Sequence, residues 1–164
     1  MKGQRIICDT GPIIALSIID HLWILKALFQ EVLLPEPVHQ EIVRGGPVLA
    51  GMSNYREASW LTVQSLAKPL DPLLRSVLDT GEASVIQLAV ETESAIVLID
   101  ELKARKVART IFRLQVIGTA RLLVEAKKLN STVSVRGALQ GMRDGGYWIH
   151  DDIAQFALRE AGEL

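Results

Sequence analysis

Two apolar segments of the sequence each end in an aspartate. Residues 5–9 read RIICD and residues 95–100 read AIVLID, so Asp9 and Asp100 follow runs suited to burial. An ionised carboxylate at the edge of a hydrophobic core is unfavourable unless a cation or hydrogen-bond donors compensate its charge. The recurrence of the pattern indicates that the two acids share a chemical purpose.

Two glutamates have positions that would allow them to join these aspartates. In residues 79–89, DTGEASVIQLA, Glu82 lies in the first turn of a predicted helix and on its apolar face. A capping box with Asp79, favoured by the helix dipole, explains the same spacing. Glu41 borders the apolar face of a helix predicted at 37–44, where an ordinary surface acid is the alternative.

Two hydroxyls and a row of basic residues lie near the predicted strand ends. Thr10 and Thr119 supply the hydroxyl groups, while Trp60 and Trp148 are interpreted as packing residues. The helix predicted after Asp100 carries basic side chains on one face, which is either a solvated face or a track for nucleic-acid phosphates. The basic stripe comprises Arg105, Lys106, Arg109 and Arg113, and the opposite apolar face comprises Ala104, Val107, Ala108 and Ile111.

Alternating strands and helices must position these side chains. We predict strands at 5–9, 31–34, 60–64, 95–99 and 115–117 and helices at 12–19, 22–29, 37–44, 80–92, 101–113, 119–129, 134–143 and 151–161, and leave 46–58 unassigned. Pro12 and Pro37 suit first helical positions, and Gly45 suits a helix end. The alternation is typical of an α/β fold with a mainly parallel sheet and helices on both faces. Ligands bind at the carboxyl ends of such strands, where Asp9 and Asp100 would meet.

Composition limits the class of protein. The chain has 164 residues, 49% of them hydrophobic and 23% charged, so we expect one domain over 1–164 with a substantial core. Its net charge of −1 gives no overall attraction to nucleic acid or membranes, so a polyanion site must be local. Cys8, the single cysteine, is expected to be a buried thiol in a cytoplasmic protein. Charged residues interrupt the longest apolar region, 11–29, so no membrane span is expected.

Several common chemistries lack their motifs. His21, His39 and His150 are isolated from one another in the sequence, which argues against a zinc site. The glycine-rich patterns of dinucleotide and P-loop sites are missing from the sequence. Ser17 and Ser84 lack the G-x-S-x-G context of a hydrolase nucleophile. The chemistry that remains is that of carboxylates.

The order and spacing of several segments are similar to those of one known family. The segments are DTGPIIAL at 9–16, PVHQEI at 37–42, GEASVIQLA at 81–89, LIDELKARKVA at 98–108, VIGT at 116–119 and GYWIHDDI at 146–153. Together they resemble PIN-domain ribonucleases, a family that includes the VapC-like toxins of toxin–antitoxin pairs. More narrowly, the chain is similar to the compact DUF3368-type subgroup, and the resemblance extends over nearly its whole length.

The resemblance implies a three-layer α/β/α sandwich with a parallel sheet of about five strands, and a C-terminal helical extension at 134–164 packed on it. It also implies an endoribonuclease that depends on Mg²⁺ or Mn²⁺, a small antitoxin partner and a homodimer. The metal-binding and catalytic acids would be Asp9, Glu41, Glu82 and Asp100, with Glu101 as an auxiliary acid. From their positions at strand ends and on the basic stripe, Thr10 and Thr119 are further auxiliary candidates, and Arg105 and Arg109 are candidate contacts to nucleic acid. Many members have Asp where this chain has Glu82. Four converging carboxylates repel one another and suit a hard divalent cation.

Two other functions fit parts of the pattern. A non-catalytic PIN-like module that binds RNA or a protein would need neither the metal nor the full set of acids. A phospho-aspartate phosphatase would use Asp9 as its nucleophile, but Gly11 stands where such enzymes have a second acid.

Overall fold

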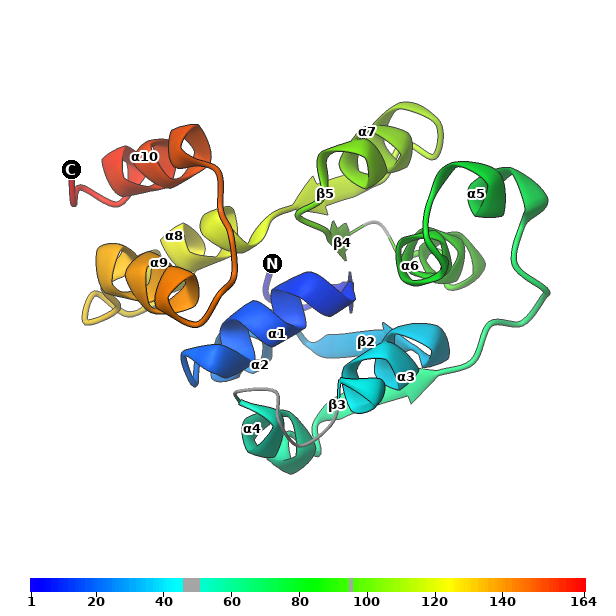
Figure 1. The fold of residues 1–164 in the computed structure, drawn as a ribbon, viewed down its shortest axis with the longest axis horizontal. Coiled ribbons are helices and arrows are strands. Elements are labelled where there is room, and N and C mark those ends of the chain that lie inside the picture. Colours follow the sequence, from blue (N-terminus) through cyan, green and yellow to red (C-terminus); the bar gives the residue numbers. More distant parts are fainter. Residues whose placement is uncertain (46–50, 95) are drawn as a thin grey trace.

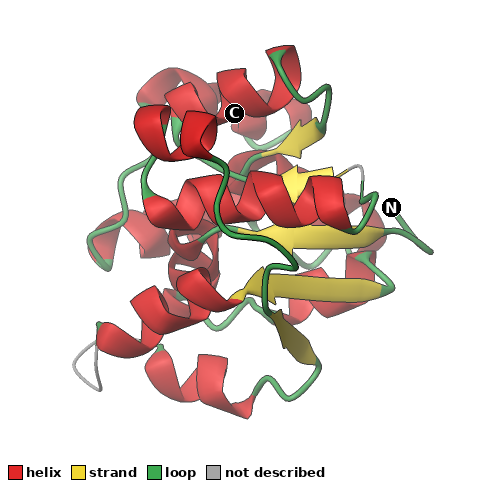
Figure 2. Ribbon diagram, turned by 90° about the vertical axis from the view of Figure 1, so that its right-hand side faces the viewer, coloured by secondary structure: helices red, strands yellow, loops and turns green. Residues whose placement is uncertain are grey.

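A parallel sheet forms the centre of the protein, as Figures 1 and 2 show. The structure is a computed structural model that describes residues 1–45, 51–94 and 96–164. The strands are β1 (Arg5–Cys8), β2 (Glu31–Pro35), β3 (Leu61–Gln64), β4 (Ile96–Leu98) and β5 (Gln115–Ile117). Their order in the sheet is β3-β2-β1-β4-β5, and each neighbouring pair is parallel. The predicted five-stranded parallel sheet is therefore confirmed.

Helices cover both faces of this sheet. They are α1 (Thr10–Ile18), α2 (Trp23–Leu28), α3 (Glu36–Arg44), α4 (Met52–Glu57), α5 (Pro72–Val77), α6 (Thr80–Glu91), α7 (Leu102–Thr110), α8 (Thr119–Leu129), α9 (Val135–Asp144) and α10 (Asp151–Glu160). Helices α1 and α2 lie on one face of the sheet and α6 and α7 on the other, an arrangement visible in Figure 1. The strand order reverses direction between these two sets, as expected when all crossovers have the same hand. The strands are buried between these layers, since Ile6, Ile7 and Leu33 have no exposed surface.

Several boundaries differ from the sequence-based prediction. The strand predicted at 5–9 ends at Cys8, and Pro12 is the third residue of α1 rather than its first. The short helices α4 and α5 were not predicted. Residue 95 of the strand predicted at 95–99 lies outside the described residues, as does the unassigned stretch 46–50. Within the described ranges, no helix is both long and apolar enough to cross a bilayer.

The chain changes direction across the sheet at β1. From β1 it continues through β2 to β3 on one side, and β4 and β5 then occupy the other side. Cys8 pairs with Leu98, and the backbone N–H of Asp9 donates to the Leu98 carbonyl at 3.0 Å. The carboxyl ends of β1 and β4 therefore border the crevice where α/β sheets most often bind ligands.

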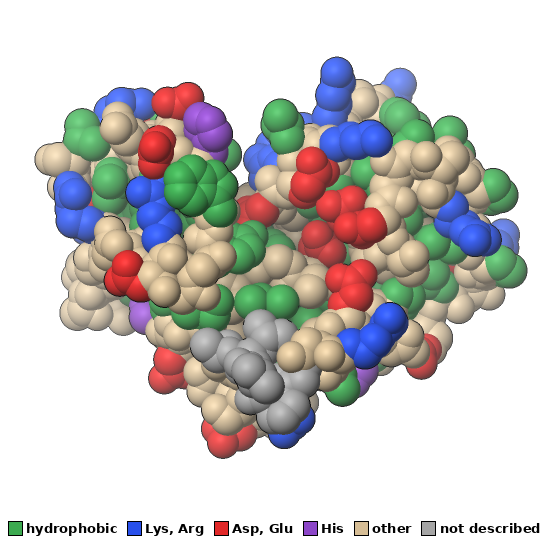
Figure 3. Space-filling view, viewed as in Figure 1, with side chains coloured by type: hydrophobic (Ala, Val, Ile, Leu, Met, Phe, Trp, Pro, Cys, Tyr) green, Lys and Arg blue, Asp and Glu red, His purple; other side chains and the backbone are tan. Residues whose placement is uncertain are grey.

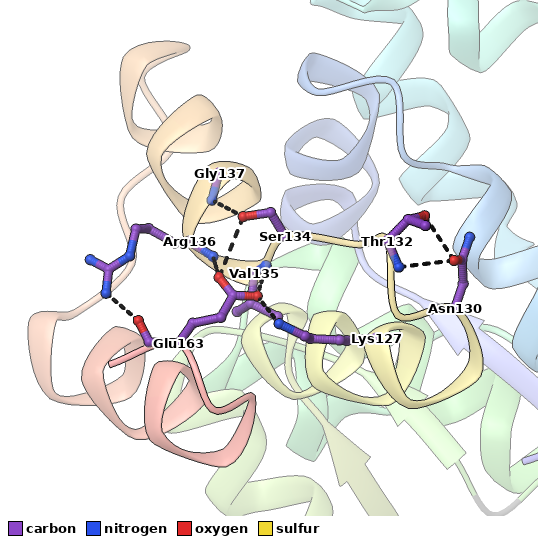
Figure 4. Close-up of polar contacts among 8 residues, drawn as sticks. All are labelled: Lys127, Asn130, Thr132, Ser134, Val135, Arg136, Gly137 and Glu163. Carbon is purple, nitrogen blue, oxygen red and sulfur yellow. Dashed lines mark hydrogen bonds and ion pairs between the residues drawn. The ribbon is translucent and has the colours of Figure 1, made fainter.

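The last two helices, α9 and α10, pack on α8. Glu163, just beyond α10, ties them together, as Figure 4 shows. Its carboxylate accepts hydrogen bonds from the Val135 N–H (2.8 Å), the Arg136 N–H (2.7 Å) and the Lys127 ammonium (2.5 Å). Burial alone would raise the pKa of Glu163, but these donors lower it to about 2. That residues 1–164 form one domain with 134–164 as an extension stays a prediction.

Candidate active site

Asp9 occupies the junction between β1 and α1. It is the N-cap residue of α1, and its side chain is only 8% exposed. Burial raises the pKa of its carboxyl from the ordinary 3.8 to about 7, although a hydrogen bond from the Thr10 backbone opposes the rise. The nearby charges of Glu82, Asp79 and Glu41 raise the pKa further. Asp9 is therefore a carboxylate surrounded by other carboxylates.

Glu82 forms the predicted capping box and also lies near Asp9. Its backbone N–H donates to Asp79 Oδ1 at 2.8 Å, and its Oε2 accepts from the Asp79 N–H at 3.4 Å, so the capping box is formed. Glu82 is also buried, and burial, followed by the charges of Asp79 and Glu101, raises the pKa of its carboxyl to about 7. The capping residue and the acid near Asp9 are thus the same side chain.

Glu41 reaches from α3 to the beginning of α1 and α6. Its Oε2 accepts a hydrogen bond from Thr10 Oγ1 at 2.8 Å. Its Oε1 lies over Gly81, where an added Cβ would be only 2.6 Å away. Glu41 is partly buried and contacts the starts of both helices. Gly81 leaves the space that this approach requires. That Glu41 binds a metal, rather than being an ordinary surface acid, stays a prediction.

Asp100 follows β4 and is held by three donors. Oδ1 accepts from the Thr119 N–H at 2.7 Å, while Oδ2 accepts from Thr119 Oγ1 and from the Tyr147 hydroxyl, both at 2.5 Å. Burial and the charges of Asp100 and Asp9 raise the pKa of Tyr147, so its phenol stays protonated and donates. Tyr147 also lies against Gly11, beside Asp9. Its hydroxyl therefore binds Asp100 and lies close to the start of α1, a position that no sequence pattern indicated.

Positively charged and auxiliary groups lie next to Asp100. The Arg105 guanidinium and Asp100 Oδ1 both lie over Gly118, and Arg105 donates to the Ile99 carbonyl at 2.7 Å. Burial lowers the pKa of Arg105, and the charge of Asp100 opposes this effect. Glu101 is exposed and accepts from the Ala104 N–H at 2.8 Å, so it caps α7.

Two sequence-based interpretations of this region are wrong. Trp148 was expected to pack in the interior, but 72% of its surface is exposed. Ile111 was assigned to the apolar face of α7, yet it is 55% exposed just beyond the last turn. Trp60 packs against the core and Cys8 is fully buried, both as predicted. Burial raises the pKa of the Cys8 thiol.

The acids Asp9, Glu41, Glu82 and Asp100 come from four segments of the chain. Figure 3 shows Asp and Glu side chains gathered in a hollow of the face viewed. Their oxygens are hard ligands. Burial, together with the charges of neighbouring carboxylates, raises the pKa values of Asp9 and Glu82, so the residues fit Mg²⁺ or Mn²⁺. In the described part of the chain, however, no three acidic, His or Cys side chains form a metal site as they stand. Oxygens of Glu41, Glu82 and Asp100 accept hydrogen bonds from protein donors instead.

A parallel sheet with acids at the crevice between its central strands defines an α/β protein whose candidate site lies at that edge. Comparison with family models then shows that this chain belongs to the PIN-domain family: the DUF3368 model, described as a PIN domain, matches residues 5–163. PIN domains are generally nucleases, so the family places this chain among proteins that act on nucleic acid. A comparison with curated proteins finds no significant match.

Proposed function

We propose that this protein is an Mg²⁺- or Mn²⁺-dependent endoribonuclease that hydrolyses RNA phosphodiester bonds. The observation that carries the proposal is the position of Asp9 and Glu82, two buried acids from separate helix starts whose pKa values are both raised to about 7. Burial is the main cause of both shifts and the charges of neighbouring carboxylates add to it, and a cation shared by several carboxylates would favour their ionised forms. A bound Mg²⁺ or Mn²⁺ would acidify an attacking water and neutralise charge on the phosphate.

The residues of the chain have separable roles in this proposal. Asp9, Glu41, Glu82 and Asp100 would hold the ion, and Glu101 is an auxiliary acid. Thr119 and Tyr147 orient Asp100, while Thr10 orients Glu41. The Arg105 guanidinium supplies positive charge beside Asp100, where the phosphate of the substrate would bind.

The test is cleavage of RNA by wild-type protein and by Asp9→Asn in the presence of Mn²⁺. We expect Asp9→Asn to lower the rate by more than about 100-fold, since even changes to residues that only hydrogen-bond to metal ligands reduce activity by up to about that factor. Glu57→Gln, at an exposed acid on α4, is the matched control and should cleave at the wild-type rate. Equal rates for wild type and Asp9→Asn, with both proteins folded, would refute the assignment.

We further propose, on family resemblance, that the protein acts in the cytoplasm as the toxin of a toxin–antitoxin pair, as a homodimer held by a small antitoxin. Expression of wild type should then arrest growth while Asp9→Asn does not, and co-expression of a small neighbouring gene product should restore growth. Light scattering of the purified protein measures the dimer. Normal growth with an active enzyme would contradict the toxin role.

A non-catalytic nucleic-acid-binding module is the second candidate. The observation that favours it is that, among the described residues, the acids do not form a ready-made metal site. Calorimetric titration with Mn²⁺ separates the two functions: heat of binding that is lost in Asp9→Asn supports the nuclease, whereas RNA binding without Mn²⁺ binding supports the module.

A further inference from the structure

A groove leads away from Asp100 along the C-terminal helices. It has a volume of about 790 Å³ and runs between α7, β5 and α8 on one side and residues 148–160 on the other. Figure 3 shows a cleft opening between the parts of the surface that contain α10 and α7. Because Asp100 is one of its lining residues, the groove is continuous with the acidic site.

The C-terminal side of the groove presents large apolar side chains to solvent. Trp148 is 72% exposed, Phe156 52% and Ile153 51%, and all three line the groove. Contiguous exposed apolar side chains on a folded protein generally mark a binding surface. The Arg143 guanidinium lies 5.6 Å from the centre of the Trp148 ring, a cation–π contact that restrains the indole.

The two sides of the groove differ in charge. Arg105, Arg109 and Arg121 line it from α7 and α8, whereas Asp152 and Glu160 line it from α10. A polyanion entering the groove is therefore attracted to one side and repelled by the other. An unpaired nucleic-acid strand matches both sides, because its phosphates can contact the arginines while its bases face the aromatic side chains.

We propose that Trp148 and Phe156 form a base-stacking subsite for an unpaired nucleotide that flanks the scissile phosphate of an RNA strand. The proposal rests on the proposed nuclease function and deepens it, because it assigns single-strand preference to residues outside the acidic site. Arg109 contacts a phosphate of the same strand. The groove thus selects an open strand, whose bases are free to stack, over a duplex, whose bases are already paired.

Binding without cleavage tests this subsite. Fluorescence anisotropy is measured in EDTA, in an Asp9→Asn background, with a labelled eight-nucleotide RNA and with an abasic strand of the same length and charge. We expect Trp148→Ala to weaken binding of the RNA by at least about 5-fold and to leave the abasic strand unchanged. Trp148→Phe should restore part of the lost affinity, because it keeps an aromatic face.

Three controls separate stacking from other effects. Trp23→Ala, at an exposed tryptophan outside the groove, should change the affinity for neither strand. Arg109→Ala should weaken the binding of both strands alike. It should also reduce the slope of log K against log salt concentration by about 0.7, the value for one phosphate on a single strand. Trp148→Ala should leave binding of an RNA duplex unchanged.

Equal affinity for the RNA and abasic strands, with no effect of Trp148→Ala, would overturn the proposal. The groove would then be a candidate surface for a protein partner. An equal loss of affinity for both strands in Trp148→Ala would also overturn it. Because the binding assay excludes metal and cleavage, base-dependent binding combined with a wild-type protein that cleaves no RNA would refute the proposed function alone. Cleavage that does not depend on Trp148, together with base-independent binding, would refute the subsite alone.

Discussion

Replacing Asp9 by Asn should stabilise the metal-free protein, and more so at high pH. The pKa of Asp9 is raised, so its protonated form is favoured in the folded state. For a raised carboxyl pKa, the native state is most stable below the pKa of the unfolded chain, and stability is lost as the pH rises toward the folded pKa. Asn removes this loss because it carries no charge at any pH in the range.

The size of the effect follows from the pKa of Asp9. A rise from 3.8 to about 7 is roughly three pH units, and each unit corresponds to about 1.4 kcal/mol. Full ionisation of Asp9 in the folded protein therefore costs roughly 4 kcal/mol, of which about 1.6 kcal/mol is already lost at pH 5. The advantage of Asp9→Asn over wild type should grow by roughly 2.5 kcal/mol between pH 5 and pH 8.

Thermal unfolding in EDTA measures this difference. For a chain of this length, 1 kcal/mol changes Tm by roughly 2–4 °C, so the Tm advantage of Asp9→Asn should grow by roughly 5–10 °C from pH 5 to pH 8. Asp20→Asn is the matched control, because Asp20 is exposed and Asn tolerates its positive φ of 57°. Added Mn²⁺ should raise the Tm of wild type and of Asp20→Asn, but have little effect on Asp9→Asn.

A Tm difference between Asp9→Asn and wild type that is constant from pH 5 to pH 8 would refute the reasoning. It would show that Asp9 titrates in the same way in the folded and unfolded chains. The electrostatic basis for a shared cation would then be lost as well.

Three further outcomes are expected. Tyr147→Phe removes the 2.5 Å hydrogen bond to Asp100 and should lower the cleavage rate by roughly 10–100-fold with little change in KM; an unchanged rate across the pH profile would argue against a positioning role. Gly81→Ala places a Cβ against Glu41, 2.6 Å from Oε1, and should reduce Mn²⁺ affinity in calorimetry, whereas unaltered affinity would place Glu41 outside the metal site. Glu163→Gln should lower the free energy of unfolding by roughly 1.5–3 kcal/mol at pH 7. Because the pKa of Glu163 is lowered to about 2, this difference should disappear as the pH falls from about 4.5 to about 2, and a pH-independent loss in urea titrations would contradict the ionic explanation.

The sheet and the location of the acids were predictable because their signals are local. A short aliphatic run that ends in Asp9 or Asp100 predicts a buried strand followed by an acid without reference to the rest of the sequence. Parallel strands then bring these ends to one edge of the sheet. The capping box of Glu82 is likewise defined within four residues. The spacing of Glu41 alone did not group it with Asp9, Glu82 and Asp100; only the family resemblance did.

The features that escaped prediction depend on short elements or distant contacts. Helices α4 and α5 each have six residues, too few for a periodic pattern, although Asp71 before Pro72 is a recognisable helix start. The Tyr147 hydroxyl meets Asp100 across 47 residues of sequence, which no local pattern records. Trp148 adjoins the buried Ile149, so only the tertiary packing decides which of the two side chains faces solvent.

The carboxylate of Glu163 makes the C-terminal helices sensitive to changes at the end of the described chain. It fastens the segment after α10 to the start of α9, and α10 in turn supplies one side of the groove. A cut just before Glu163 would therefore loosen that side while leaving every lining residue in place. Affinity tags and crosslinkers are accordingly better attached at the opposite end of the chain, where residues 1–4 are exposed.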